Sequence, residues 1–429
     1  MGAQEWGRSL LGKFGLKGRA QWSWAFYDWG NSGFATTIMT AILPIYFFDV
    51  AAKDLGENVR TALWAYISAG SLLVTALLSP LLGALADLYG RKKMFLAIFT
   101  VLGIIGSALL YFVGEGDYVI ASIAYLIGNI GFSGGMIFYD CLLPHIAEED
   151  ERDAVSLSGF AFGYLGGGLL LLANMLWIMN FDAWGFASKS DAVRWSFLSV
   201  AVWWGLSTIP VMLWVEEPKT TARPDRDLHP FRNAWERLQG TFRDLKRYRQ
   251  VMLFLIAFWI YSDGIGTVMK MATTYGREIG ISQSNLMLSL LAVQFLGLPC
   301  TLFYTPLMNR FKPKSLLLGT LGVYSLVCIL GYYLESAWQF WMLAIMVAMV
   351  QGGSQALSRS IFANMIPKSR SGEFFSFFSV SAKFAGVFGP AMFGVISQVM
   401  GESRLSILSL LILFIGGAFL LMKVDVDAK

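Results

Sequence analysis

Two long apolar runs of this sequence meet at the stretch Gly83-x-Leu85-Ala86-Asp87-x-x-Gly90-Arg91-Lys92-Lys93. We interpret this stretch as a tight turn between two membrane-spanning helices. Gly83 would let a neighbouring helix approach closely, and Gly90 can adopt the left-handed conformation that a tight turn needs. Asp87 lies where the first helix ends, and the three cations that follow are typical of an anionic membrane surface. The sequence therefore predicts a turn at the membrane surface that carries both a carboxylate and a basic cluster.

The composition of the whole chain also indicates a membrane protein. Of its 429 residues, 56% are hydrophobic and only 14% are charged, and the mean hydropathy is +0.57. A soluble core could not bury so much apolar surface. Because a spanning helix needs about 20 apolar residues, we predict an all-α polytopic membrane protein with twelve transmembrane helices, near residues 20–48, 60–86, 93–114, 117–140, 154–180, 192–215, 250–275, 284–308, 315–334, 338–365, 372–400 and 404–423.

The chain divides into two similar halves. Three landmarks recur at a nearly constant offset: the turn at Asp87 matches a turn at Asn309, Pro144 matches Pro367, and Gly163-x-x-Gly166 matches Gly386-x-x-Gly389. Such repeats are typical of carriers built from two related bundles. We therefore predict two pseudo-symmetric six-helix bundles that face each other across a central cavity.

The domain boundaries follow from the one long polar segment. We expect an N-terminal bundle at residues 1–215, a cytoplasmic linker at 216–249 and a C-terminal bundle at 250–429. For the linker, two interpretations stay open. Apolar residues at helical spacing favour an amphipathic helix on the inner leaflet, whereas the prolines allow a solvated connector.

The distribution of cations predicts the orientation in the membrane. Most of the 33 Lys and Arg residues lie in the two termini and in the even-numbered loops. Because cytoplasmic loops carry an excess of Lys and Arg, we expect both termini in the cytoplasm and the protein in the cell inner membrane.

No residue pattern of an enzyme or a metal site stands out. The three cysteines, Cys141, Cys300 and Cys328, lie in or beside apolar runs without metal or redox spacing, and His145 is far from His229. Motifs of hydrolases, kinases and dinucleotide enzymes are absent. We therefore expect no enzymatic activity, no metal and no cofactor.

The turn at residues 83–93 resembles the motif between helices 2 and 3 of the major facilitator superfamily. Gly83, Asp87, Gly90, Arg91 and Lys92 match that motif, whereas Leu88 stands where the family usually has a base. The resemblance implies the major facilitator fold. Three longer stretches resemble the "unknown major facilitator" branch, which is similar to fungal vacuolar amino-acid effluxers; they begin at Phe26-Tyr-Asp28-Trp, Gln351-Gly-Gly-Ser-Gln355 and Gly372-Glu373-Phe-Phe. This second resemblance implies a carrier of amino acids or related metabolites.

Charges inside the predicted helices are the candidate substrate and proton sites. A charge in hydrocarbon costs at least about 2.5–3.5 kcal/mol, so a retained one is a functional candidate. We predict an acidic site at Asp28 in the N-terminal half facing cations of the C-terminal half, which suits a zwitterion or a small anion. Asp28 and Asp263 are the predicted proton-coupling residues. The predicted substrate-binding residues are Asp28, Lys383, Arg359, Lys270, Tyr27 and Gln355.

Structural interpretations of these residues remain alternatives. Asp28 and Lys383 could form an internal salt bridge, amides such as Gln355 could only join helices, and Arg359 could extend toward a membrane surface. We also predict a gate made of Gly83, Asp87, Gly90, Arg91, Asp140 and Glu373. In it, Asp87 contacts the start of the run at 372–400, and Arg91 pairs with Asp140.

These observations predict a secondary active transporter for a small polar metabolite, amino-acid-like or an organic anion. We expect alternating access, coupling to protons, a monomer in the lipid bilayer and no nucleic-acid partner. One alternative is a carrier of lipids or amphiphiles. A membrane receptor that binds but does not transport is an alternative of another class.

Overall fold

The computed structural model describes residues 16–56, 63–64, 67, 70–71, 74, 79–86, 89–217, 248–384, 386, 388–400 and 403–426. Within these residues the regular structure is helical, and ten helices are long and apolar enough to span a membrane. The predicted linker at 216–249 lies almost wholly outside the described residues, and so does Asp87.

The first group of helices, which we call the N-half, begins with a long first span. It comprises α2 (Arg19–Gly33), η1 (Phe34–Ile42), α3 (Leu43–Tyr46), η2 (Phe47–Ala51), α5 (Lys92–Leu109), η3 (Leu110–Phe112), α6 (Tyr118–Ile146), α7 (Arg152–Met179) and α8 (Lys189–Trp214). The first span changes from α-helix to the wider π-helix directly after Gly33. Such π segments are frequent near functional sites.

The second group, which we call the C-half, begins at Arg249. It comprises α10 (Arg249–Glu278), α11 (Gln283–Leu307), α12 (Pro313–Tyr332), α13 (Ala337–Met365), η4 (Lys368–Arg370), α14 (Ser371–Phe384), α15 (Phe388–Met400), α16 (Ser403–Ser409) and α17 (Leu411–Lys423). Several of these helices begin at the expected signals. Ser336 and Gln339 form a capping box on α13, and Pro313 opens α12 where its missing N–H costs nothing.

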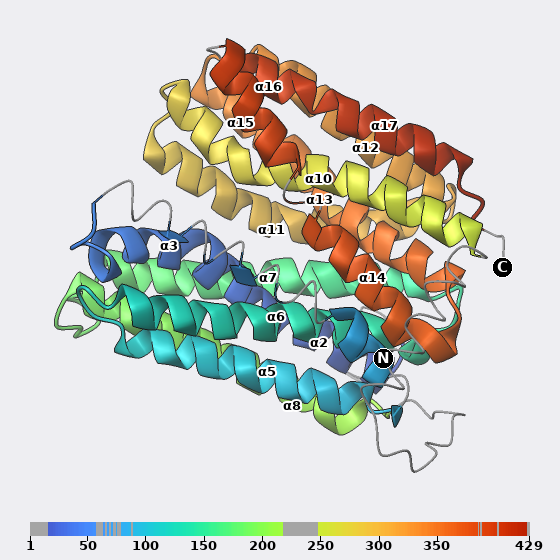
Figure 1. Cartoon of the computed structure of the whole chain (residues 1–429), viewed down its shortest axis with the longest axis horizontal. Helices are drawn as coiled ribbons and strands as arrows, with labels where there is room; N and C mark the ends of the chain where they lie inside the picture. Colours follow the sequence, from blue (N-terminus) through green and yellow to red (C-terminus); the bar gives the residue numbers. More distant parts are fainter. Residues whose placement is uncertain are drawn as a thin grey trace, which may run out of the picture.

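Helices of each half lie side by side, and the two groups form separate layers (Figure 1). Helix α7 packs against α11 and α13, and α6 packs against α14, so these five helices join the halves. Helix α2 begins and helix α17 ends toward the same end of the molecule (Figure 1). We call this end, where α2, α7, α10 and α14 begin, the terminal end.

Small residues allow the helices to pack closely. Membrane helices depend on such packing, because burial of apolar surface from water cannot drive their association in a bilayer. On α5 and α6, a Cβ on Gly106 would meet the backbone of Gly128, and a Cβ on Gly131 would meet that of Gly103. Gly83 lies against the main chain of Gly372, so the predicted close approach of another helix at Gly83 is confirmed. Gly90 has φ of +62°, which confirms the predicted left-handed turn.

Two of the predicted runs are interrupted within the residues that the structure describes. The run at 372–400 is divided into α14, which ends at Phe384, and α15, which begins at Phe388. The sequence around the division explains it, since Pro390 lacks the N–H that a continuous helix uses. Asp263 of α10 accepts a hydrogen bond from the Gly389 N–H at 2.6 Å and so stabilises the start of α15. The run at 404–423 is likewise divided into α16 and α17.

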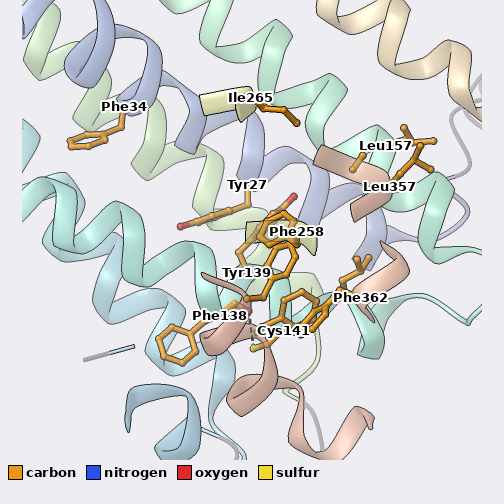
Figure 2. Packing of buried hydrophobic residues seen from close by; sticks show 14 of the residues in the cluster. Tyr27, Phe34, Phe138, Tyr139, Cys141, Leu157, Phe258, Ile265, Leu357 and Phe362 are labelled. Carbon is orange, nitrogen blue, oxygen red and sulfur yellow. Dashed lines mark hydrogen bonds between the residues drawn. The ribbon is translucent and has the colours of Figure 1, made fainter. Parts of the chain in front are cut away.

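The largest packed cluster crosses from one half to the other. Tyr27 and Tyr139 of the N-half belong to the same cluster as Phe258, Leu357 and Phe362 of the C-half (Figure 2). All five side chains are at most 7% exposed. The two halves therefore pack directly against each other around Tyr139.

Candidate functional site

Arg359 of α13 reaches from the C-half into the N-half, and its side chain is only 2% exposed. Its Nε donates to the Ser156 hydroxyl at 2.9 Å, and its Nη2 donates to the Ser156 carbonyl at 2.8 Å. Its Nη1 donates to the Asp140 carboxylate at 3.1 Å. The cation of one half is thus held by an acid and a serine of the other.

Three aromatic rings complete the surroundings of this guanidinium. Arg359 Cζ lies 4.2 Å from the ring centre of Phe160, 4.7 Å from that of Trp24 and 5.4 Å from that of Tyr139. Ring faces attract a guanidinium, most strongly where water is excluded. We call Trp24, Tyr139, Asp140, Ser156 and Phe160 the Arg359 cage.

The cage corrects two of the contacts expected from the sequence. Asp140 binds Arg359, not Arg91, whose guanidinium contacts the Met94 sulfur. Arg359 does not extend toward a membrane surface, because it is buried and ion-paired. Arg359 lies 219 residues from Asp140 in the sequence and in the other half, so sequence position gives no sign of this contact.

Asp28 of α2 lies next to the cage and has an unsatisfied oxygen. It is 4% exposed, its Oδ1 accepts from the Ser32 hydroxyl at 3.4 Å, and its Oδ2 has no hydrogen-bond partner. A Cβ on Gly163 of α7 would lie 3.2 Å from Asp28 Cγ, so this glycine makes room for the carboxyl. Arg359 and Asp140 are the charges that act on Asp28. A buried carboxylate oxygen without a donor is costly, and a ligand ammonium or a proton would satisfy it.

Tyr27 and Gln355 make contacts that the sequence could not assign. The Tyr27 hydroxyl shares a hydrogen bond with Thr100 at 3.0 Å, entirely within the N-half. Gln355 accepts from the Tyr164 hydroxyl at 3.1 Å and so joins the two halves. The ring of Tyr164 packs against Gly297, whose Cβ would lie 3.0 Å from it. Tyr27 and Gln355, both predicted to bind substrate, therefore also make hydrogen bonds within the protein in this structure.

Asp263 and Lys270 lie at the division between α14 and α15. Asp263 is 2% exposed, its Oδ2 binds the Gly389 N–H, and its Oδ1 has no hydrogen-bond partner. Lys270 is exposed and donates to the Gly386 carbonyl at 3.2 Å. The Asp263 carboxylate thus contacts the N-terminus of α15, and the Lys270 ammonium contacts the Gly386 carbonyl, which follows the C-terminus of α14. Both placements are favourable for the helix dipoles.

Of the remaining predicted residues, the structure describes only some side chains. The backbone of Lys383 lies near the end of α14, but its side chain and the whole of Asp87 are outside the described residues. Glu373, in the first turn of α14, is fully buried and accepts from Arg370 at 3.1 Å. The described residues contain no group of three or more His, Cys, Asp or Glu side chains that could hold a metal ion.

Further contacts between the halves gather at the terminal end. Arg152 of α7 is 3% exposed and donates to the Ala363 carbonyl at 3.1 Å and to the Asn364 side chain at 2.7 Å. Glu148 and Lys368 form an exposed ion pair at 3.4 Å. In this structure the terminal end is therefore closed.

A hydrogen bond within the N-half also lies at this end. Lys17 donates to Glu151 at 2.8 Å, and this bond lowers the pKa of the Glu151 carboxyl below its usual range.

Most of the cage, namely Trp24, Tyr139, Ser156 and Phe160, was not predicted from the sequence. A weak signal was available at Tyr139, which stands next to an acid near the end of an apolar run. Ser156 and Phe160 gave none, because a serine or an aromatic residue is ordinary in a membrane helix. Their role depends on which face of α7 meets α13, and sequence spacing does not determine that.

A protein-family comparison matches residues 17–429 to the family described as "Vacuole effluxer Atg22 like". The chain belongs to the Atg22-like family. Its similar relatives include an uncharacterized MFS-type transporter, YxiO, from Bacillus subtilis, which is 36% identical over 95% of both chains. Another is autophagy-related protein 22 of Yarrowia lipolytica, 27% identical over 66% of this chain and 52% of the relative.

Solved structures of major facilitator proteins show the same fold. The human organic anion transporter MFSD10 aligns with a TM-score of 0.74 at 12% identity, covering 94% of this chain and 99% of that one. The E. coli fucose:proton symporter FucP aligns with a TM-score of 0.68 at 14% identity, covering 95% and 98%. The Atg22-like chain is thus an integral, multi-pass membrane protein with the major facilitator fold, and it belongs with transporters. The predicted family and fold class are confirmed.

Proposed function

We propose that this Atg22-like protein is a secondary active transporter for a small polar metabolite that carries an ammonium, a carboxylate or both, as amino acids do. The observation that carries the proposal is the buried pair of opposite charges between the halves. Asp28 offers an unpartnered carboxylate oxygen, and Arg359 offers a guanidinium from the other half. The family description, a vacuole effluxer, agrees with a transporter, and MFSD10, which shares the fold, is an organic anion transporter, which agrees with this substrate class.

In this arrangement the solute would compete with the protein's own ion pair. Arg359 is satisfied by Asp140 and Ser156 while the terminal end is closed. For the halves to separate there, Arg359 must leave these partners, and an unpaired buried cation is costly. A solute carboxylate could replace Asp140 as the partner of Arg359, while the solute ammonium binds Asp28. Binding would thus lower the cost of opening.

Proton coupling belongs to the same proposal. A proton on Asp28 would satisfy its Oδ2 when no ammonium is bound, so the empty and loaded carriers could both be neutral at this position. Asp263 is a second candidate, because its Oδ1 is also buried without a partner. We also propose that Lys383 binds substrate, because it lies in α14 close to the break between α14 and α15, where Asp263 binds the start of α15.

The orientation and working unit are likewise proposals. Cations such as Lys92, Arg152 and Lys368 lie at the terminal end, which favours a cytoplasmic location for this end. We propose that the protein lies in the cell inner membrane. Because the charges of the site all come from one chain, we propose a monomer as the transporting unit.

Ligand binding by purified protein tests the proposal. We expect amino acids or small organic anions to raise the thermal unfolding temperature of the wild type. Asp28→Asn should weaken binding of an amine-containing ligand about 30-fold or more, since removing a buried charged partner costs about 2–5 kcal/mol. Asp182→Asn, at an exposed loop position, is the matched control and should bind normally. Equal affinity in wild type and Asp28→Asn would contradict the proposed site.

A further inference from the structure

A second polar cluster joins the halves at the terminal end, away from Arg359. The Lys92 ammonium of α5 lies 2.9 Å from His145 Nε2 of α6 and donates to the hydroxyl of Ser371 at 2.8 Å. Ser371 is the first residue of α14, so Lys92 connects the N-half with the C-half. The Ser371 hydroxyl also lies 3.3 Å from His145 Nε2 and donates to the Cys141 carbonyl at 3.1 Å. We call Lys92, His145 and Ser371 the terminal latch.

The geometry determines the protonation state of His145 in this conformation. A lysine ammonium has three donors and no acceptor, so the nitrogen that faces it at 2.9 Å must accept. His145 is therefore neutral, with its proton on Nδ1. A second proton, on Nε2, would remove the acceptor and place two positive charges at contact distance.

A proton on Nε2 would add a positive charge to His145, which already lies among other cations. Lys92 faces it from α5, Arg152 from α7 and Lys368 from η4, and Ser371 of α14 presents only a hydroxyl. Glu148, three residues along the chain from His145, is paired with Lys368 on the exposed side. Lys92 and Ser371 are 3% and 0% exposed, so water does not screen the interaction fully. His145 is only half-buried, which leaves it open to protons from the terminal side.

We propose that His145 is a proton-sensitive switch of the terminal latch: a proton taken up at Nε2 displaces Lys92 from His145 and Ser371 and frees the start of α14. Acid on the terminal side then favours opening of the halves at that end. This switch goes beyond the solute specificity proposed above, because it concerns the distance between the halves and not what they carry. Histidine is suited to this role, since its charge in water changes between about pH 5 and 8. A His145 released from Lys92, Arg152 and Lys368 can therefore take up a proton that the closed latch disfavours.

The test measures the separation of the halves in the full-length protein. Spin labels would be attached to cysteines introduced at Asp150, beside the end of α6, and at Ser369, beside the start of α14, both of which are exposed. The three native cysteines are replaced by alanine. The interspin distance is measured in nanodiscs at about pH 7.5 and about pH 5, which bracket the titration of an ordinary histidine.

We expect the wild-type latch to lose most of its short-distance population on acidification. His145→Gln, which cannot gain a charge, should keep the short distance at both pH values, and His145→Lys should show the long distance already at about pH 7.5. His229→Gln removes the only other histidine of the chain and should respond to pH as the wild type does. Each variant must first retain its monodisperse elution and its unfolding transition.

Three results would overturn the proposal. One is a wild-type distance that does not change down to about pH 5. Another is an acid-induced opening of His145→Gln as large as that of the wild type. The third is a His145→Lys variant that folds and keeps the short distance. None of these depends on whether the amino-acid proposal is correct, because no solute is present.

Discussion

Replacing Arg359 by alanine should destabilise the protein by about 3–5 kcal/mol, since it leaves Asp140 buried without its partner. Arg359→Lys should recover only part of the loss, because one ammonium cannot bind both Ser156 acceptors and Asp140 in the same geometry. Thermal unfolding in detergent measures both effects.

Arg404→Ala provides the matched control at an exposed ion pair. Arg404 lies 3.9 Å from Glu335, and the two side chains are 38% and 72% exposed. Exposed pairs contribute only about 0–1 kcal/mol. If Arg359→Ala lost no more stability than Arg404→Ala, the Arg359 cage would not hold the halves together as we describe.

At this scale the sequence predicted which charged residues are buried better than what they contact. Asp28 and Arg359 were found because charges in apolar runs are rare and costly. The partner of Arg359 was not found, because Asp140 becomes its neighbour only when α6 and α13 pack across the two halves. Lys270 and Asp263 were predicted to bind ligand or protons, and their contacts with the division in the run at 372–400 depend on a break that hydropathy does not reveal.

Among the helices, the pair α5 and α6 makes the sharpest prediction. A Cβ on Gly131 would meet the backbone of Gly103, and main-chain atoms cannot move aside as a flexible side chain can. Gly131→Ala should therefore cost about 1–3 kcal/mol and separate the two helices locally. The unfolding temperature of the variant measures the loss.

Gly322→Ala on α12 is the control for Gly131→Ala, because nothing lies within 4 Å of the added Cβ. It should be neutral or slightly stabilising, since alanine favours helix more than glycine does. A Gly131→Ala protein as stable as Gly322→Ala would mean that α5 and α6 are not in backbone contact.

Hydropathy predicted the helices well and their interruptions poorly. The runs at 154–180 and 338–365 correspond to single helices within a few residues. The run at 372–400 is long and mostly apolar, so hydropathy alone gave one helix. Its division rests on Pro390 and on the hydrogen bond from Gly389 to Asp263, a contact between positions 126 residues apart.

For the whole molecule, we predict that holding the terminal end closed stops transport. Cysteines at Glu148 and Lys368, whose native side chains form an ion pair across the halves at 3.4 Å, can be joined by a short bifunctional thiol reagent. Joining them in protein without native cysteines should abolish solute flux, and cleavage of the reagent by a reductant should restore it.

Cysteines at Lys53 and Glu115 are the control pair, because their native side chains form an ion pair within the N-half. The same reagent there should leave flux unchanged. Undiminished flux through a protein fully cross-linked at 148 and 368 would mean that the halves do not separate at the terminal end.

The two-bundle organisation and the major facilitator fold could be predicted from the sequence because the repeat and the turn at Gly83 to Lys93 are local patterns. Which end is closed could not, since a conformational state depends on contacts such as those of Arg152, Ser371 and Arg359 between distant segments. The same limit applies to the solute, because the site is completed only when α2, α7 and α13 meet.

Solute flux in proteoliposomes is the most direct test of the central claim, that Asp28 between the halves binds an amine-containing solute or a proton during transport. Flux of a labelled amino acid that stabilises the wild-type protein is measured with and without a pH gradient, alongside Asp28→Asn. We predict that the gradient drives wild-type flux and that Asp28→Asn loses both its rate and its response to the gradient. An Asp28→Asn protein that keeps both would contradict this role of Asp28.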